Sequence, residues 1–313
     1  MTTTETAPRP RLSPDALKGS PRRHRRERTV KVLFLGAALI SLIISALIII
    51  SLVSEAWTFI SQVEWASLWT IGWFPRRGLY DIKTLFVASL IVGGIAMLVA
   101  APVGLAAAMY LSEYARPRVR KVLKPIIEIL AGIPSVVLGF FALAFISPNF
   151  IQRFTDANLQ NLAAAGIGVG ILTVPLVSSV AEDAMSAVPN SLREASAGLG
   201  ARKMTTSLRV VAPAAVSGLV AALIIGVSRA IGETMVVFIA GGGGDGAIYT
   251  HSPLDPGMTM TAAMASLATG TDAVVGEGLT FQSLFFVGIL LFLITFLLNL
   301  IADRFVRRVR QAY

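Results

Sequence analysis

Six stretches of the chain are apolar and nearly free of charged residues. A helix that crosses a hydrocarbon core of about 30 Å needs about 20 apolar residues. The first stretch, residues 32–54, contains no charged residue and is dense in Ile and Leu. We therefore predict an all-α integral membrane protein with six transmembrane helices and with both chain termini on the same side of the membrane. The predicted spans are residues 32–54, 84–111, 125–147, 162–181, 213–240 and 279–301.

Basic residues distinguish the two sides of the membrane. Of the 27 Lys and Arg residues, 22 lie in the N-terminal segment, in the loops after the second and fourth spans, and in the C-terminal tail. Only Arg76, Arg77, Lys83 and Arg153 fall on the other side. Because Lys and Arg are enriched in cytoplasmic loops, we predict that both termini are cytoplasmic. The net charge of +9 is then a topology signal beside anionic lipid, and we expect no binding to nucleic acid.

The segments outside the spans have distinct compositions. Residues 1–31 are rich in basic residues, and we expect them to form a disordered cytoplasmic tail ahead of a transmembrane domain at 32–313. All four Trp residues lie between Trp57 and Trp73, which favours an interfacial or short external helix that anchors the chain. The external segment 241–280 contains acidic residues but no Lys or Arg, and a short helix is expected near residues 258–267.

Composition excludes several classes of protein. The chain is 55% hydrophobic and 14% charged, whereas soluble domains carry about 25% charged residues, so a soluble enzyme is excluded. There is no Cys, and the two His residues lie far apart in the sequence, so we expect neither a metal site nor thiolate chemistry. No Gly-Lys pair occurs, so the chain lacks the phosphate-cradling loop of an ATPase. If ATP drives this protein, another chain hydrolyses it.

The loop at 182–212 carries a spaced motif that runs on into the fifth span. It reads Glu194-Ala195-Ser196, three residues, Gly200, nine residues, and a segment that ends at Pro213. This resembles the EAA signature of ABC-importer permeases, which is Glu-Ala-Ala, three residues, Gly, nine residues and Ile-x-Leu-Pro. Gly200 suits a sharp exit from a helix, and Pro213 suits the first turn of the next membrane helix.

The resemblance implies a type I ABC-importer permease fold in which this loop couples to an ATPase. In that family the loop forms a short cytoplasmic helix that sits in a groove on the ATPase and transmits its closure to the membrane helices. The resemblance then implies that Glu194, Ala195, Ser196, Gly200 and Pro213 are coupling residues. An interfacial amphipathic helix without a partner is the alternative interpretation.

Two further segments narrow the resemblance. They are Gly132-Ile133-Pro134-Ser135 in the third span and Ser228-Arg229-Ala230-Ile231-Gly232-Glu233-Thr234-Met235 in the fifth. From about residue 30 to the C-terminus the chain resembles the C-type membrane subunits of the bacterial phosphate-specific transport (Pst) system. This implies a non-enzymatic permease of the bacterial inner membrane that translocates inorganic phosphate by alternating access. The implied partners are an A-type permease, two ATPase subunits that hold ATP and Mg, and an external phosphate-binding protein that docks near 241–280. No cofactor is implied in this chain.

Two charged residues lie inside the fifth span. A charge at the bilayer centre is costly, so Arg229 and Glu233 are expected to face protein or water and to serve function. Four residues apart on a helix, they would share one face. A guanidinium suits a phosphate oxyanion as a bidentate partner, and Glu233 could accept the hydrogen bond from a protonated phosphate or hold Arg229 oriented when the site is empty. We predict a substrate path formed by Arg229, Glu233, Ser228, Thr234 and Ser135. A salt bridge that only joins helices is the alternative.

Other interpretations remain open at this stage. Lys124 and Glu128 are one turn apart, and we expect an ion pair between them at the cytoplasmic end of the third span. An importer for another oxyanion (sulfate, molybdate or phosphonate) would share the same motifs. A secondary anion transporter or channel would explain the spans and Arg229, but not the spacing of the EAA-like motif. A membrane anchor or assembly protein would explain neither motif.

Overall fold

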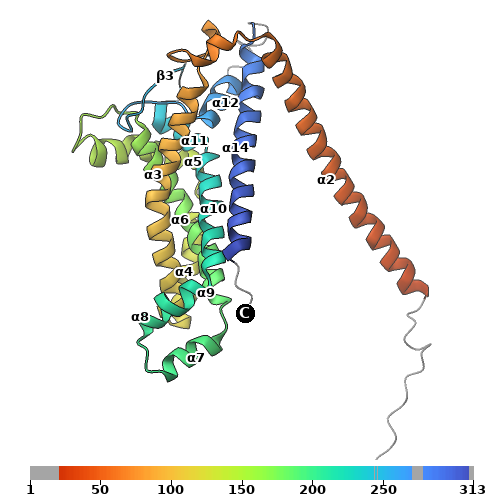
Figure 1. The fold of residues 1–313 in the computed structure, drawn as a ribbon, viewed down its shortest axis with the longest axis vertical. Coiled ribbons are helices and arrows are strands. Elements are labelled where there is room, and N and C mark those ends of the chain that lie inside the picture. Colours follow the sequence, from red (N-terminus) through yellow and green to blue (C-terminus); the bar gives the residue numbers. More distant parts are fainter. Residues whose placement is uncertain (1–20, 243, 245, 270–277, 310–313) are drawn as a thin grey trace, which may run out of the picture. The chain divides into compact units, whose positions relative to one another are not determined.

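The chain divides into two units, residues 1–51 and 52–313. A computed structural model describes residues 21–242, 244, 246–269 and 278–309. Helix α2 (Pro21–Gln62) supplies all of the described part of the first unit and continues into the second (Figure 1). In the first unit its apolar side chains are exposed, as expected where lipid or another protein replaces water. Residues 21–31 are helical, whereas the sequence predicts a disordered tail up to 31; residues 1–20 of that tail lie outside the described part.

Helices dominate the second unit. Four helices of the described chain are long and apolar enough to cross a membrane, and six spans result if each of two bent helix pairs is one span. The four long helices are α2, α3 (Ile82–Met109), α6 (Leu162–Ser186) and α14 (Thr280–Val309). The segment η3 (Tyr110–Tyr114) continues α3 in the wider π-helical form. The fold is the all-α membrane architecture that the sequence predicts.

The third predicted span is a bent pair. Helix α4 (Pro117–Leu130) meets α5 (Ser135–Phe141), continued by η4 (Ala142–Ile151), at an angle of 84°. The break falls at Gly132-Ile133-Pro134. Proline lacks an N–H group and disfavours helical backbone in the residue before it, so Pro134 ends one helix and precedes the next.

The fifth predicted span is interrupted twice. The segment α8 (Lys203–Thr206), η5 (Ser207–Val211) and α9 (Ala212–Ala214) meets α10 (Val216–Ile231) at an angle of 74°. A second break separates α10 from α11 (Met235–Val237) and η6 (Phe238–Gly242). This break comes at Gly232, which costs more backbone entropy in a helix than most residues do. The bend at Ala215 leaves no mark in the hydropathy pattern, because the sequence is apolar on both sides of it, whereas the second break coincides with Glu233 and Thr234, which interrupt the apolar run.

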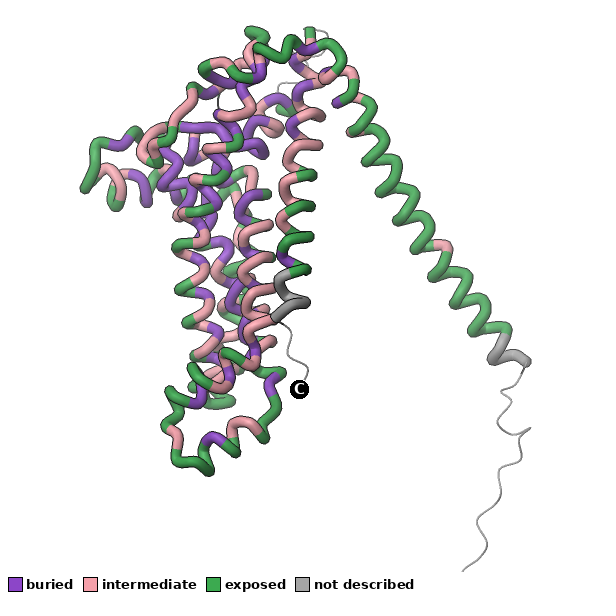
Figure 2. Tube along the Cα trace, in the orientation of Figure 1, coloured by how far each residue is buried: buried purple, intermediate pink, exposed green. Residues whose placement is uncertain are grey.

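Small residues bring α3 and α6 together at the centre of the second unit. A methyl group placed on Gly170 would lie 2.8 Å from the side chain of Val99, and one on Gly104 would lie 2.9 Å from Val177. Glycine at these positions lets the two backbones approach closely, which is how membrane helices gain packing contacts. Figure 2 shows α6 largely buried among its neighbours, in agreement with its long row of buried residues.

One end of the second unit carries a small antiparallel sheet. Its strands are β1 (Gly72–Phe74), β2 (Leu79–Tyr80) and β3 (Ala247–Ile248), in the order β2-β1-β3, and Trp73 is opposite both Tyr80 and Ala247. Trp73 is buried with Tyr80 against its ring, so it is a core residue and not an interfacial anchor. Short 3-10 helices, η1 (Trp65–Trp69) and η2 (Pro75–Arg77), flank β1. The remaining helix at this end, α12 (Met260–Thr269), overlaps the short helix expected at 258–267.

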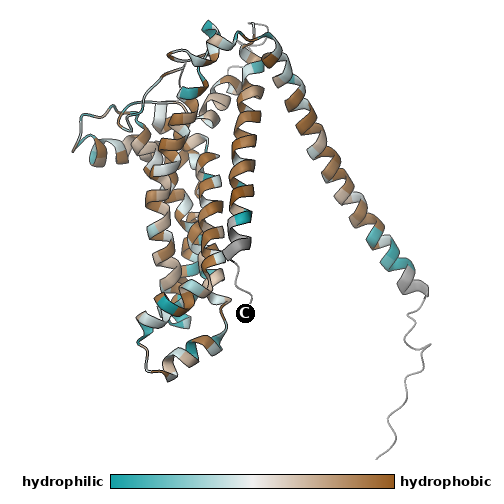
Figure 3. Ribbon diagram, in the orientation of Figure 1, coloured by the Kyte–Doolittle hydropathy of each residue, from teal (hydrophilic) through white to brown (hydrophobic). Residues whose placement is uncertain are grey.

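The other end carries a helical excursion. Helix α7 (Asn190–Gly198) follows α6 and leads through a tight turn into α8. Figure 3 shows that hydrophobic positions run along the long helices of the second unit, whereas hydrophilic positions gather at their ends, including α7 and α8. This end is the one that the basic residues of the 182–212 loop occupy.

Candidate functional site

Helix α7 is the short helix that the EAA-like motif predicts. It begins after Pro189 and ends at Gly198, and Gly200 turns the chain back with a left-handed backbone (φ of 76°). The N–H of Gly200 donates to the carbonyl of Ala197 across 2.9 Å, and the N–H of Ala201 donates to that of Ser196 across 3.1 Å. These bonds satisfy carbonyls that the helix end leaves free, as in glycine-terminated helices generally. The loop is therefore a helix, a glycine turn and a second helix.

The motif residues point in two directions. Glu194, Ala195 and Leu199 are exposed, and 90% of Leu199 is accessible. Ser196 is buried, and its hydroxyl lies 2.8 Å from that of Thr206 in α8. Leu199, the C-cap residue of α7, adds an apolar side chain to this exposed set. The loop thus offers an outer face of Glu194, Ala195 and Leu199, and Ser196 holds its inner side.

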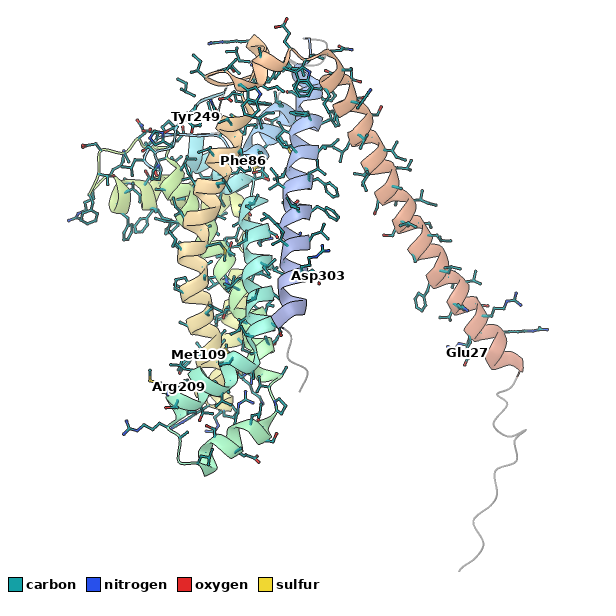
Figure 4. The ribbon with its side chains drawn as sticks, viewed as in Figure 1. Glu27, Phe86, Met109, Arg209, Tyr249 and Asp303 are labelled. Atoms are coloured by element: carbon teal, nitrogen blue, oxygen red, sulfur yellow. The ribbon has the colours of Figure 1, made fainter. Side chains whose placement is uncertain are left out.

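The sequence predicts that Pro213 lies in the first turn of the long membrane helix, but the structure places it before that helix. It is in the three-residue helix α9, and α10 begins three residues later, after the bend at Ala215. Val211, just before α9, is fully buried in an apolar cluster with Met185 and Ala108, against which Leu192 of α7 packs. The last part of the motif therefore joins α7 to α3 and α6 by packing. Figure 4 labels Met109, another member of this contact, and Arg209 at this same end of the second unit, opposite Tyr249.

Arg193, which directly precedes the motif residue Glu194, contacts one carboxylate and two backbone carbonyls at once. Its Nη2 lies 2.8 Å from Oε1 of Glu113 in η3. Its Nη1 donates to the carbonyl of Val188 across 2.6 Å, and its Nη2 donates to that of Met185 across 2.9 Å. Sequence reasoning missed this arrangement. Two features of the sequence could have indicated it. Arg193 directly precedes Glu194, and Glu113 is the first charged residue after the apolar run of the second span.

A second ionic cluster joins α4 to α6. The carboxylate of Glu182 is fully buried, binds Arg120, and lies 2.6 Å from Nζ of Lys124. Lys124 also lies 3.0 Å from Asp183. Within the described residues Lys124 forms no ion pair with Glu128, which is exposed, so the predicted pairing along α4 is wrong. A buried carboxylate needs a compensating charge more than an exposed one does, so Glu182 takes the cation.

Arg229 and Glu233 do not share a helix face. Arg229 lies in the last turn of α10 and is exposed, whereas Glu233 lies beyond Gly232 in the break before α11. The backbone N–H of Glu233 donates to the carbonyl of Ala230 at 3.4 Å, and its own carbonyl accepts from Thr261 at 2.8 Å. No ion pair joins Arg229 to Glu233 in the described part of the chain, so geometry gives no support to a simple salt bridge between them.

The remaining residues predicted for the substrate path lie around the same breaks. Ser228 donates to Asn299 of α14 across 3.0 Å, and Thr234 lies in the break itself. Ser135 is the first residue of α5, which packs against α11. A methyl group on Gly139 of α5 would meet Ile239 at 3.0 Å, so this glycine allows close approach. The structure therefore brings the broken third and fifth spans together.

The end of the second unit that carries the sheet contains a cavity of about 480 Å³. Its lining includes Phe74, Ile248, Tyr249 and Asp255, and Thr250 donates to Asp255 across 2.8 Å. The described residues contain no group of three or more His, Cys, Asp or Glu side chains that could hold a metal ion. The geometry therefore offers surfaces for partners and a polar break inside the membrane helices.

Comparison with known proteins identifies the architecture. Residues 100–311 match the family described as binding-protein-dependent transport system inner membrane component. A phosphate transport system permease protein PstC of Haemophilus influenzae is 30% identical over 88% of this chain and 91% of its own length. A probable ABC transporter permease protein YqgH of Bacillus subtilis is 35% identical over 64% of this chain and 65% of its own length.

Solved structures agree with this assignment at the level of the fold. The crystal structure of a bacterial ABC transporter involved in the import of the acidic polysaccharide alginate matches with a TM-score of 0.61 at 16% identity. That match covers 92% of this chain and all of the other. An inward-facing MetNI methionine ABC transporter matches with a TM-score of 0.53 at 21% identity, over 73% of this chain and 94% of the other. The chain belongs to the family of binding-protein-dependent transport system inner membrane components, the multi-pass permease subunits of ABC importers.

Proposed function

We propose that this chain is a permease subunit of an ATP-driven importer for inorganic phosphate. The observation that carries the proposal is helix α7 with the left-handed turn at Gly200, an exposed coupling element on a chain whose PstC relatives match most of its length. The similarity to phosphate transport permeases over 88% of the chain favours phosphate over sulfate, molybdate and phosphonate. In a secondary transporter or channel, the exposed helix α7 would have no ATPase to bind and its motif would have no function.

The outer face of α7 is proposed to dock on a separate ATPase subunit that binds ATP and Mg. Glu194, Ala195 and Leu199 supply that face, and Gly200 sets its exit. Ser196 holds the loop from its buried side, and the exposed Pro213 lies in α9, where the loop passes into the fifth span. Because this chain lacks a phosphate-cradling loop for ATP, closure of the ATPase pair has to reach the membrane through contacts of this kind.

The side of the membrane follows from the basic residues. We place α7, α4 and both termini in the cytoplasm, because 22 of 27 Lys and Arg residues gather there, and β3 with the 241–280 segment outside. The cavity beside Tyr249 and Asp255 then faces the external phosphate-binding protein. Ile248, 69% exposed at its rim, is a suitable apolar contact for that protein.

The substrate path is proposed at the broken helices. Arg229 is exposed in the single chain, and a guanidinium facing lipid would be costly, so water or a second permease subunit has to cover it. A second permease of the A type would supply the opposite wall of the path. Arg229 would contact the phosphate transiently, with Glu233, Thr234, Ser228 and Ser135 around the break. Non-helical backbone is tolerated at membrane depth where it lines a cavity. The break at Gly232 would line the substrate path in this way.

The test is reconstitution of the complete importer in liposomes. Binding protein loaded with phosphate is expected to stimulate ATP hydrolysis several-fold and to drive phosphate uptake, whereas sulfate in place of phosphate is expected to do neither. Empty binding protein is the control. Equal stimulation by sulfate would assign the importer to a different oxyanion, and uptake without ATP would indicate a secondary transporter.

A further inference from the structure

The guanidinium of Arg193 joins the motif helix to two membrane helices. Its contact with Met185, 2.9 Å long, reaches the last turn of α6, and its contact with Val188, 2.6 Å long, reaches the turn that follows α6. Its contact with Glu113, 2.8 Å long, reaches η3 and through it α3. The side chain of Glu113 is only 6% exposed, and that of Arg193 is 22% exposed. The ion pair is therefore mostly shielded from water, where charge-assisted hydrogen bonds are strong and directional.

Arg193 and Glu194 are neighbours with opposite surroundings. Glu194 is on the exposed face of α7, whereas Arg193 is directed at the membrane helices. The same loop makes a second polar contact with η3, since Nζ of Lys203 lies 5.1 Å from the ring centre of Tyr114, the residue after Glu113. The apolar contact of Leu192 with the cluster around Met185 adds packing but no directional bond, because dispersion attraction does not depend on orientation as a charge-assisted hydrogen bond does.

We propose that the Arg193–Glu113 pair is the mechanical link through which a displacement of α7 reaches α3. Arg193 and Glu113 are then positioning residues for transport, since neither touches substrate or nucleotide. The inference deepens the proposed function and rests on it for the docking of α7 on an ATPase. A link that resists stretching moves α3 and the end of α6 together with α7. Without it, α7 keeps only directionless packing here, through Leu192 against the cluster around Met185, and the ATPase turns over with less movement of the membrane helices.

The experiment measures phosphate moved per ATP hydrolysed in the reconstituted importer. Arg193→Met and Glu113→Gln are each expected to lower this ratio about three- to tenfold, while the ATPase still copurifies with the permease. Arg193→Lys keeps the charge but cannot reach the carboxylate and both carbonyls, so an intermediate ratio is expected. Arg118→Met is the matched control, because Arg118 is an exposed arginine of α4 outside this network, and its ratio is expected to stay unchanged.

The double variant Arg193→Met with Glu113→Gln separates a joint role from two independent ones. If the pair acts as one link, the double variant couples no worse than Arg193→Met alone. Losses that multiply in the double variant, or wild-type ratios in both single variants, would overturn the proposal. Glu113→Gln keeps the shape and one acceptor, so it reports on the link even where Arg193→Met fails to insert.

A second measurement separates this proposal from the proposed function. The chain contains no Cys, so a nitroxide can be attached at Ser191→Cys, an exposed position of α7. Greater nitroxide mobility is expected with Glu113→Gln and Arg193→Met, and not with Arg118→Met. If the wild-type importer shows no phosphate-stimulated hydrolysis, the proposed function fails; if the nitroxide mobility is also unchanged by Glu113→Gln, the link fails as well.

Discussion

The hydroxyl oxygens of Ser196 in α7 and Thr206 in α8 lie 2.8 Å apart and are buried. Together with the N–H of Ala201, which donates to the carbonyl of Ser196, this bond closes the loop around Gly200. The family signature has Ala at the position of Ser196, so the chain has added a polar contact on the inner side. The outer residues stay available to a partner because the inner ones hold the shape.

Replacement of Gly200 tests whether this turn needs its backbone conformation or its space. A methyl group on Gly200 would meet nothing within 4 Å, so only the φ of 76° opposes a side chain. We expect Gly200→Val to cost about 1–2 kcal/mol and Gly200→Asn to cost less, because Asn visits this region more readily. Thermal denaturation of the detergent-solubilised chain measures both, and uptake is expected to follow the same order. Equal losses of stability for Gly200→Asn and Gly200→Val would show that backbone strain does not determine the cost of replacing Gly200.

Replacement of Glu182 tests the buried ionic cluster. Glu182→Gln removes the charge that compensates Arg120 and Lys124, and we expect a loss of about 3–5 kcal/mol in the free energy of unfolding. Asp183→Asn is the control, because the Asp183 side chain is 66% exposed and its pair with Lys124 is worth at most about 1 kcal/mol. Denaturation midpoints of the two variants, measured in the same detergent, compare them. A loss for Asp183→Asn as large as that for Glu182→Gln would contradict the assignment of the cluster to Glu182.

Membrane sidedness is tested by single cysteines on the Cys-free background. Leu199→Cys and Ile248→Cys are exposed at opposite ends of the second unit. In intact cells an impermeant thiol reagent is expected to label position 248 without permeabilisation and position 199 only after it. Asp255→Cys and Gly200→Cys are the second pair and should repeat the pattern. Labelling of position 199 in intact cells would contradict the proposed orientation and indicate the opposite one.

The fold class and the motif helix could be predicted from the sequence, whereas the internal breaks and the ion pairs could not. Apolar runs reveal how many residues can lie in lipid, but the hydropathy pattern is unchanged at Ala215, where the chain bends by 74° before α10. Lys124 is four residues from Glu128 and 58 from Glu182, and only burial of Glu182 in the folded chain explains which acid it binds. Trp73 resembles an interfacial anchor by residue type, yet the pairing of β1 with two strands places it in the core.

The last prediction concerns Arg229 and its relation to Glu233. Because Gly232 ends the helix between them and no ion pair joins them among the described residues, we expect Arg229 to act on the anion and not on Glu233. Arg229→Gln should abolish phosphate uptake with expression and ATPase assembly intact, and Arg229→Lys should retain at most a minor fraction, because Lys loses the planar fork. Val227→Ala, a half-buried apolar neighbour in α10, is the control for local packing. The decisive comparison is Arg229→Gln combined with Glu233→Gln: if the two charges only neutralise each other, the double variant regains transport, since neither charge is left unpaired. Uptake at matched expression is the measurement, and we expect no recovery in the double variant.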